Sequence, residues 1–337
     1  MSEKVKKGSW IHYAIIIAVL HIAGLAGLLT VVHDLPAFWS MGLLAYTLGL
    51  RHAFDADHIA AIDNSVRKLV QEKRNALGTG FYFSLGHSSV VFLMVVALCI
   101  SLQWAQGFMP DMQRVGGVIG MSVSGIFLLI VGLINLVVLV KLVAIIRKGR
   151  HVRTDPAKLE QLLESRGLIA RLAKPALKLV SRSWHLYPLG FLFGLGFDTA
   201  TEIGLLALSA SAVQNAASVW GLLSLPLLFA AGMSLLDTAD GVFMTRAYNW
   251  ALITPMRKLY YNTTITAVSV AAALIIGAVE LLQTFSGEMA QGNPLFSWVN
   301  RLNFDYMGYG LAALLFGAWL VSVLRRRSNP IIKNVES

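Results

Sequence analysis

The stretch IHYAIIIAVLHIAGLAGLLTVV, residues 11–32, contains no Asp, Glu, Lys or Arg. As an α-helix it would extend about 33 Å, enough to cross a hydrocarbon core of about 30 Å. Similar apolar runs recur along the 337-residue chain, which is 56% hydrophobic and has a mean hydropathy of +0.65. Only 14% of its residues are charged, against about 25% in soluble domains. The composition therefore predicts an all-α polytopic membrane protein.

We predict eight transmembrane helices. They lie at residues 11–32, 38–63, 79–102, 117–142, 187–212, 219–242, 262–284 and 307–324. The first run is longer than the apolar core of a signal peptide, and no cleavage-site pattern follows it. We therefore expect it to remain as the first span.

The net charge of +10 is distributed unevenly over the predicted connections. Of 28 Lys and Arg, only Arg51, Arg114 and Arg301 fall within spans or on the side of the odd-numbered connections. The other 25 lie at the ends of the chain, in the even-numbered connections or at the inner end of span four. Because cytoplasmic loops are enriched in Lys and Arg, both termini are predicted to be cytoplasmic. The basic charge thus indicates topology and lipid contact, and we expect no nucleic-acid partner.

One long hydrophilic connection divides the chain into two halves of four spans. We predict a first half at 1–143, a basic cytoplasmic loop at 144–186, a second half at 187–326 and a cytoplasmic tail at 327–337. Within the loop, Asp155-Pro156 is typical of a helix start. Leucines and an isoleucine then recur at helical spacing among basic residues, which favours an amphipathic helix on the inner leaflet over a simple linker.

Short matches between the halves suggest a duplicated unit. Leu48-Gly49 precedes Phe54-Asp55 in span two, as Leu195-Gly196 precedes Phe197-Asp198 in span five. Phe83-Ser-Leu-Gly-His-Ser88 in span three resembles Phe229-Ala-Ala-Gly-Met-Ser234 in span six. In the predicted topology spans 2–4 and 5–7 would run in opposite directions. Such an inverted repeat is typical of secondary transporters with a site near the bilayer midplane.

The candidate site residues are ionisable side chains inside predicted spans two, three, five and six, where one charge costs at least about 2.5–3.5 kcal/mol. Such residues usually mark a functional site, and here they include imidazoles as well as carboxylates. The candidate metal ligands are His52, Asp55, Asp57 and His58 in span two, His87 in span three, Asp198 and Glu202 in span five, and Asp237 and Asp240 in span six. Asp63 belongs to the same polar cluster of span two.

Helical geometry separates one of these residues from the rest. At about 100° per residue, Asp55 and His58 share a broad face with His52, whereas Asp57 points almost opposite Asp55. A straight helix therefore cannot direct all four side chains at one ion. Either Asp57 acts indirectly or on a neighbouring helix, or the helix is distorted between Gly49 and His58.

The chemistry of the side chains restricts the ion. Cys99 is the only cysteine, so thiolate sites are excluded and the ligands must be nitrogen and oxygen. Imidazoles with carboxylates suit Ni²⁺, Co²⁺ or Zn²⁺, whereas all-oxygen sites favour Mg²⁺, Ca²⁺ or Mn²⁺. The alternative is that individual residues are interhelical hydrogen-bonding groups. That alternative is preferred for His21 and is as favourable as ligation for His87.

Four stretches resemble the signature regions of the nickel/cobalt transporter family. They are Arg51-His-Ala-Phe-Asp-Ala-Asp-His-Ile59, Leu195-Gly-Phe-Asp-Thr-Ala-Thr-Glu202, Gly232-Met-Ser-Leu-Leu-Asp-Thr-Ala-Asp240 and Leu259-Tyr-Tyr-Asn-Thr-Thr-Ile-Thr-Ala-Val-Ser269. The resemblance covers the whole membrane domain. It implies a single-component, eight-span secondary transporter that takes up Ni²⁺, with Co²⁺ as the second candidate ion, across a bacterial cytoplasmic (inner) membrane. It also implies that His52, Asp57 and His58 are required, with Asp55 in the same element.

The alternatives to a nickel transporter are a membrane metalloenzyme and a carrier with another ion or direction. A membrane metalloprotease would carry His-Glu-x-x-His, which is absent. A desaturase-type centre needs many His, and of the eight in the chain, His12, His33, His151 and His185 lie near or outside the predicted membrane ends. We therefore expect no enzyme and no cofactor, the metal ion being the transported substrate. The remaining alternative is a carrier of Zn²⁺ or Mn²⁺, or a metal exporter.

Overall fold

A computed structural model describes residues 10–148, 180–196, 200–214, 218–251, 255–286, 294–299, 301–302 and 304–328. In these residues helices are present and strands are not. The first half contains α1 (Ile11–Val32), α2 (Phe38–His52), α3 (Ala56–Gln71), α4 (Thr79–Ile100) and α5 (Leu102–Lys148). The second contains the short 3₁₀ helix η1 (Ser183–His185), α9 (Leu186–Gly194), α10 (Ala200–Gln214), α11 (Val219–Ala251), α12 (Pro255–Ser286), α13 (Pro294–Val299) and α14 (Phe304–Ser328).

The predicted all-helical membrane class agrees with the surface of the molecule. Along α1, exposed apolar side chains recur every three or four residues and form a stripe that faces away from the protein. The stripe consists of Ile11, Ile15, Val19, Ile22, Leu25 and Leu29. Among the described residues, 5 helices are long and apolar enough to cross a membrane. An outward apolar stripe on such a helix is the surface expected against lipid tails.

Two predicted spans are not continuous helices. The span predicted at 38–63 is divided into α2 and α3 by residues 53–55, and α3 continues to Gln71. The span predicted at 187–212 is divided into α9, which ends at Gly194, and α10, which begins at Ala200. The span predicted at 117–142 is part of the 47-residue helix α5. The predicted amphipathic loop helix lies outside the described residues.

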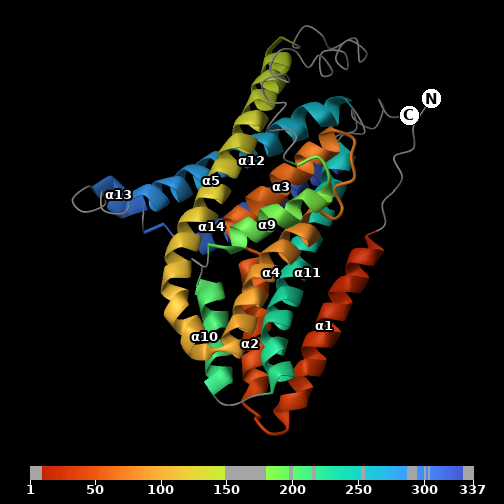
Figure 1. Ribbon diagram of the computed structural model, residues 1–337. Helices are drawn as coiled ribbons and strands as arrows, with labels where there is room; N and C mark the ends of the chain where they lie inside the picture. Colours follow the sequence, from red (N-terminus) through yellow and green to blue (C-terminus); the bar gives the residue numbers. More distant parts are fainter. Residues whose placement is uncertain are drawn as a thin grey trace.

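The helices form a bundle with two directions of packing (Figure 1). Helices α1, α2, α4, α10 and α11 run side by side in the lower part of Figure 1. Helices α3, α9 and α12 cross obliquely above them, and α5 extends along most of the molecule. Helices α2 and α10 therefore belong to the lower group, and α3 and α9 to the oblique group above it. The two breaks, between α2 and α3 and between α9 and α10, lie where these groups meet.

Helices of the two halves approach each other in two similar pairs. A Cβ at Gly49 of α2 would lie 2.1 Å from the carbonyl oxygen of Phe229 on α11. A Cβ at Gly190 of α9 would lie 2.0 Å from the carbonyl oxygen of Phe83 on α4. Small residues allow backbones in membranes to pack this closely. Because Phe83 and Phe229 are equivalent in the sequence match, α2–α11 and α9–α4 are corresponding contacts that join the two halves.

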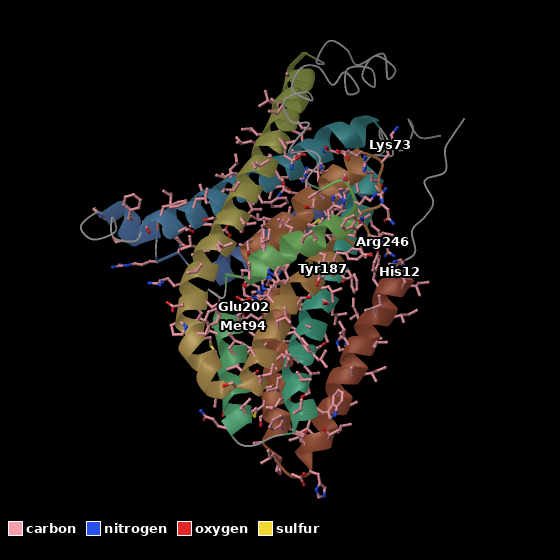
Figure 2. The ribbon with its side chains drawn as sticks, in the orientation of Figure 1. His12, Lys73, Met94, Tyr187, Glu202 and Arg246 are labelled. Atoms are coloured by element: carbon pink, nitrogen blue, oxygen red, sulfur yellow. The ribbon has the colours of Figure 1, made fainter. Side chains whose placement is uncertain are left out.

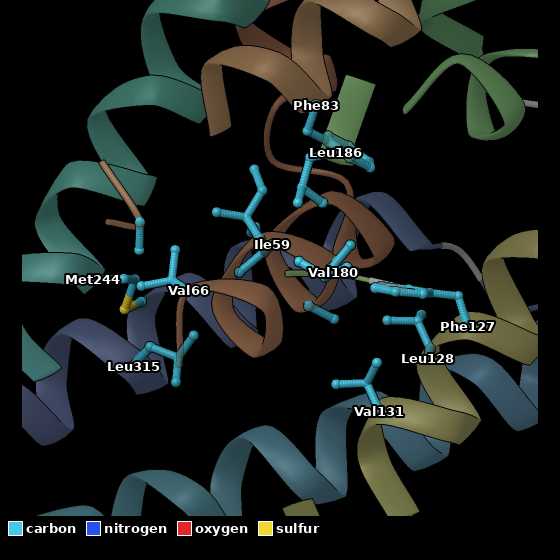
Figure 3. Close-up of a cluster of buried hydrophobic side chains, with 14 of the residues drawn as sticks. Ile59, Val66, Phe83, Phe127, Leu128, Val131, Val180, Leu186, Met244 and Leu315 are labelled. Carbon is cyan, nitrogen blue, oxygen red and sulfur yellow. The ribbon is translucent and has the colours of Figure 1, made fainter. Parts of the chain in front are cut away.

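Helix α3 is buried on all sides by other helices. Figure 3 shows Ile59 and Val66 of α3 among side chains from several helices. The surrounding residues include Phe83, Phe127, Leu128, Val131, Val180, Leu186, Met244 and Leu315. Even Arg67 and Lys68 of α3 are only 1% and 6% exposed. Polar groups of α3 therefore have to find partners inside the protein.

The end of α3 lies near the beginning of α1. A Cβ at Gly78, in the connection after α3, would lie 2.4 Å from the Tyr13 hydroxyl oxygen of α1. Figure 2 shows Lys73, which follows α3, at the upper right end of the molecule, with Arg246 of α11 and His12 of α1 below it. Glu202 lies away from that end, midway along the bundle (Figure 2). The direction from His52 through α3 to Lys73 therefore leads from the interior of the bundle to this end.

Candidate metal site

The break between α2 and α3 forms the centre of the candidate site. Helix α2 ends at His52, and the amides of Phe54 and Asp55 donate to the carbonyl oxygens of Arg51 and His52 at 3.0 and 2.9 Å. Asp55 then adopts an extended backbone (φ −63°, ψ 141°) as the N-cap residue of α3. The chain thus turns within three residues. This change of direction brings side chains from both helices to one place.

Three buried imidazoles meet at this break. His52 comes from α2, His58 from α3 and His87 from α4, and they are 1%, 0% and 3% exposed. One ring nitrogen from each lies within 4.8 Å of the others. The Nε2 atoms of His52 and His87 are 2.9 Å apart. Two nitrogens bound at right angles to one ion at about 2.1 Å would be separated by about 3 Å. The spacing is that of a hydrogen bond between the two rings, and it also matches neighbouring ligands on a single metal ion.

Carboxylates hold the other sides of two of these rings. The Nδ1 atom of His52 lies 2.7 Å from Asp55 Oδ2, and the Nδ1 atom of His58 lies 3.3 Å from Asp237 Oδ2 on α11. The Nε2 atom of His52 faces His87, and that of His58 is buried and makes no hydrogen bond. Carboxylates bonded to the outer nitrogen of a metal-binding His fix its tautomer and orientation. Asp55 and Asp237 are placed for this role.

One carboxylate joins the cluster itself. Glu202, in the first turn of α10 and 1% exposed, places Oε1 2.8 Å from His87 Nε2. The neighbouring Thr201, also buried, places Oγ1 2.9 Å from His52 Nδ1. Glu202 was predicted from the sequence, but Thr201 was not, because a hydroxyl in a membrane helix is usually an interhelical hydrogen-bonding group. Its position directly before Glu202 was the only available signal.

The break also explains the position of Asp57. The predicted distortion between Gly49 and His58 is present, and Asp57 lies in the first turn of α3. It is half-buried and within electrostatic range of His52 and His58. A helix N-terminus carries partial positive charge, which a carboxylate in the first turn offsets. Asp57 therefore makes the beginning of α3 more favourable for a nearby cation.

The remaining candidates are placed differently. Asp198 lies outside the described residues. Asp240 is three residues beyond Asp237 on α11, and its Oδ2 atom is buried without a hydrogen-bond partner. It makes no hydrogen bond with the three imidazoles. His21 bonds through Nδ1 to the Ile17 carbonyl at 2.8 Å and through Nε2 to the Tyr46 hydroxyl at 3.2 Å. The bond to Tyr46 of α2 is the interhelical contact proposed for it, and the bond to Ile17 lies within α1.

Helix α14 packs directly against the break. The rings of Phe54 and Tyr309 stack with centroids 5.1 Å apart. A Cβ at Gly308 would lie 1.6 Å from the Phe54 carbonyl oxygen, whereas a Cβ at Gly310 would have nothing within 4 Å. The shape of the break thus depends on the absence of a side chain at Gly308.

Replacing Gly308 with alanine is expected to push α14 away from the break. Overpacking of this kind costs about 1–3 kcal/mol, so the purified protein should unfold at a lower temperature and bind metal more weakly. Thermal unfolding in detergent and equilibrium metal binding measure both effects. The matched control, Gly310→Ala on the same helix, should behave like the unmodified chain. Equal behaviour of the two variants would show that α14 does not shape the break.

Fold and site together define a multi-span helical membrane protein with a buried imidazole–carboxylate cluster. A family model described as "High-affinity nickel-transport protein" (NicO) matches residues 38–325. The nickel transporter NixA of Staphylococcus aureus is 54% identical over 316 residues, covering 94% of each chain. The nickel transporter NicT of Mycobacterium tuberculosis is 44% identical and covers 96% of this chain and 91% of its own. The cobalt transport protein NhlF of Rhodococcus rhodochrous is 39% identical, covering 93% and 91%.

The chain belongs to the high-affinity nickel-transport protein family. The resemblance predicted from the four sequence stretches is thereby confirmed. No solved structure matches the chain.

Proposed function

We propose that the protein is a secondary transporter that takes up Ni²⁺ across the bacterial cytoplasmic membrane, with Co²⁺ as a second substrate. The observation that carries this proposal is the convergence of three buried imidazoles and Glu202 at the α2–α3 break. Nitrogen and oxygen donors in this combination suit Ni²⁺ and Co²⁺. The similarity to nickel transporters, and to one cobalt transport protein, supports the same ions.

The proposed ligands are His52, His58, His87 and Glu202. Asp55 and Asp237 orient two of the imidazoles, and Asp57 adds negative charge at the beginning of α3. We retain Asp198 as a proposed residue of the site from the sequence, and Asp240 as a carboxylate beside it. The carboxylates offset the charge of a divalent ion, which the low-dielectric interior would otherwise disfavour. The ion is cargo, so the site has to bind it reversibly.

We propose an eight-span architecture in which two spans are broken. Helices α2–α3 and α9–α10 would each cross the membrane once, in two pieces, and α14 would add to the 5 long apolar helices. The breaks then lie near the bilayer midplane. The matching contacts of α2 with α11 and of α9 with α4 support an inverted repeat. Movement of one repeat against the other would open the site to each side in turn.

Uptake of radioactive nickel by cells that express the full chain tests this function. We expect accumulation about tenfold or more above cells with an empty vector, since a carrier replaces a negligible leak across hydrocarbon. An excess of Co²⁺ should reduce the uptake of nickel. The same excess of Mn²⁺ should not, because Mn²⁺ prefers oxygen ligands. Accumulation equal to the vector control, or lower than it, would reject nickel uptake and favour another ion or export.

A further inference from the structure

A second buried polar network lies on α3, separate from the candidate metal site. The Arg67 guanidinium donates hydrogen bonds to the Tyr248 hydroxyl at 2.5 Å and to Ser269 Oγ at 2.6 Å. It also donates to the hydroxyl of Thr266. Its ion-pair partner Asp63 lies 3.7 Å away on the same helix and accepts a hydrogen bond from Tyr248. The network therefore ties three helices together: α3, α11 through Tyr248, and α12 through Thr266 and Ser269.

The network is fully removed from solvent and lipid. Arg67, Asp63 and Tyr248 are 1%, 1% and 4% exposed. A buried guanidinium is costly unless it is paired and hydrogen-bonded. Here its two terminal nitrogens donate to three hydroxyl groups and Asp63 supplies the counter-charge, while its Nε atom makes no hydrogen bond. Such an arrangement is stable in only one relative position of the three helices. A displacement of α11 or α12 from α3 would break several of its bonds at once.

The network lies between the metal site and the end of the molecule that carries Lys73. Arg67 follows His58 by nine residues on α3, which corresponds to about 14 Å along the helix. Helix α11 connects the two places, because Asp237 contacts His58 and Tyr248 contacts Asp63 and Arg67. These two residues of α11 are eleven positions apart and therefore lie on nearly the same face. One helix face thus contacts both the metal site and the network.

The corresponding helix of the other half has no such network. Helix α10, which follows the second break as α3 follows the first, contains no charged residue after Glu202. Of these two described helices, only α3 therefore carries a buried charged network. In the predicted topology the network lies on the cytoplasmic side, since the connection that follows α3 packs on the beginning of α1 through Gly78 and Tyr13.

We infer that Arg67, held by Asp63, Tyr248, Thr266 and Ser269, is the cytoplasmic gate of the transport path. Release of an ion into the cell requires α11 and α12 to separate from α3, which breaks the bonds of Arg67. On the outward side, α10 holds no charged residue after Glu202 whose pair would have to break. Arg67 is thus a positioning residue that controls access and does not bind the transported ion. The identity of the transported ion rests on the proposed function, whereas the closure of the cytoplasmic side by Arg67 does not.

A single reporter cysteine measures the gate directly. Met244 lies on the same face of α11 between Asp237 and Tyr248, is 3% exposed, and packs near Val66 of α3 (Figure 3). Because Cys99 is the only native cysteine, Cys99→Ser with Met244→Cys provides one reactive thiol. The full chain is placed in inside-out membrane vesicles without metal. The rate of labelling by a membrane-impermeant maleimide then reports access from the cytoplasmic side.

In this background, Arg67→Met is expected to raise the labelling rate about tenfold or more. The substitution removes three hydrogen bonds and one ion pair, and the loss of even one charge-assisted hydrogen bond corresponds to a population shift of about tenfold. Labelling in right-side-out vesicles should not change, and purified protein should bind Ni²⁺ with unchanged affinity. Arg114→Met is the matched control, because Arg114 forms an exposed pair with Asp111. Its labelling rate should equal that of the background. Tyr248→Phe, which removes one hydroxyl, should raise the rate by a smaller factor.

An unchanged labelling rate of Arg67→Met in inside-out vesicles would overturn the gate. An equal rise in inside-out and right-side-out vesicles would also overturn it, because that result indicates a general loosening of the helix packing. If Arg67→Met does not accumulate as a folded protein, Tyr248→Phe decides by the same measurement, and an unchanged rate in that variant overturns the gate. Failure of the unmodified chain to take up nickel would reject the proposed function alone. The labelling experiment contains no metal and would still decide whether Arg67 closes the cytoplasmic side.

Discussion

Replacing His87 with alanine is expected to weaken Ni²⁺ binding by more than about 100-fold and to abolish uptake. Loss of even an outer partner of a metal-binding His costs about 10–100-fold in affinity, and His87 is placed as a direct ligand. Its Nε2 atom lies 2.9 Å from His52 Nε2 and 2.8 Å from Glu202 Oε1. Removal of the ring therefore removes the group that joins α4 to α2 and α10. Equilibrium binding to purified protein, with uptake in cells, measures both effects.

His21→Ala is the matched control for this prediction. His21 is also an imidazole inside a membrane helix, but its two nitrogens bond to the Ile17 carbonyl and the Tyr46 hydroxyl. The variant should lose some stability and keep its affinity for Ni²⁺. Full affinity in His87→Ala, or equal losses in the two variants, would show that His87 is an interhelical hydrogen-bonding residue. The sequence left these two roles of His87 equally favourable, and only its neighbours in space separate them.

The break in the first polar span was partly predictable. Counting residues around a helix showed that Asp57 could not share a face with Asp55, so either a distortion or an indirect role was required. The structure contains the distortion at residues 53–55. No proline marks it, and its shape depends on the close approach of Gly308 from α14, more than 250 positions away. Hydropathy detects the length of an apolar segment but not such a contact, so 38–63 was predicted as one span.

The Arg67 network could not be predicted for a related reason. In the sequence, Arg67 and Lys68 have the composition of a cytoplasmic helix end and were counted only as topology signals. Their burial follows from the apolar helices that surround α3 on every side, with partners at positions 180, 248, 266 and 269. Helical periodicity carries no information when all faces of a helix are covered. Tyr248, Thr266 and Ser269 are also ordinary residues for membrane helices.

Asp63→Asn is expected to lower the free energy of unfolding by about 3–5 kcal/mol, because it leaves the buried Arg67 without its counter-charge. Asp63 is the only carboxylate with a described ion pair to Arg67, and both side chains are 1% exposed. Unfolding of the purified protein in mixed micelles measures the change. Asp111→Asn removes the acid of an exposed pair with Arg114, whose side chains are 69% and 77% exposed. That variant should change stability little, since solvent screens such pairs.

A double variant separates the effect of charge from the effect of side-chain size at Asp63 and Arg67. Asp63→Asn combined with Arg67→Met removes both charges and keeps side chains of similar size, so most of the lost stability should return. The two single changes should therefore be strongly non-additive, as expected for residues in direct contact. Additive losses would mean that Asp63 and Arg67 stabilise the protein independently. Because the double variant lacks the guanidinium as well, it should recover its stability while its cytoplasmic side stays accessible. Stability and closure of the gate are thus separate consequences of one buried ion pair.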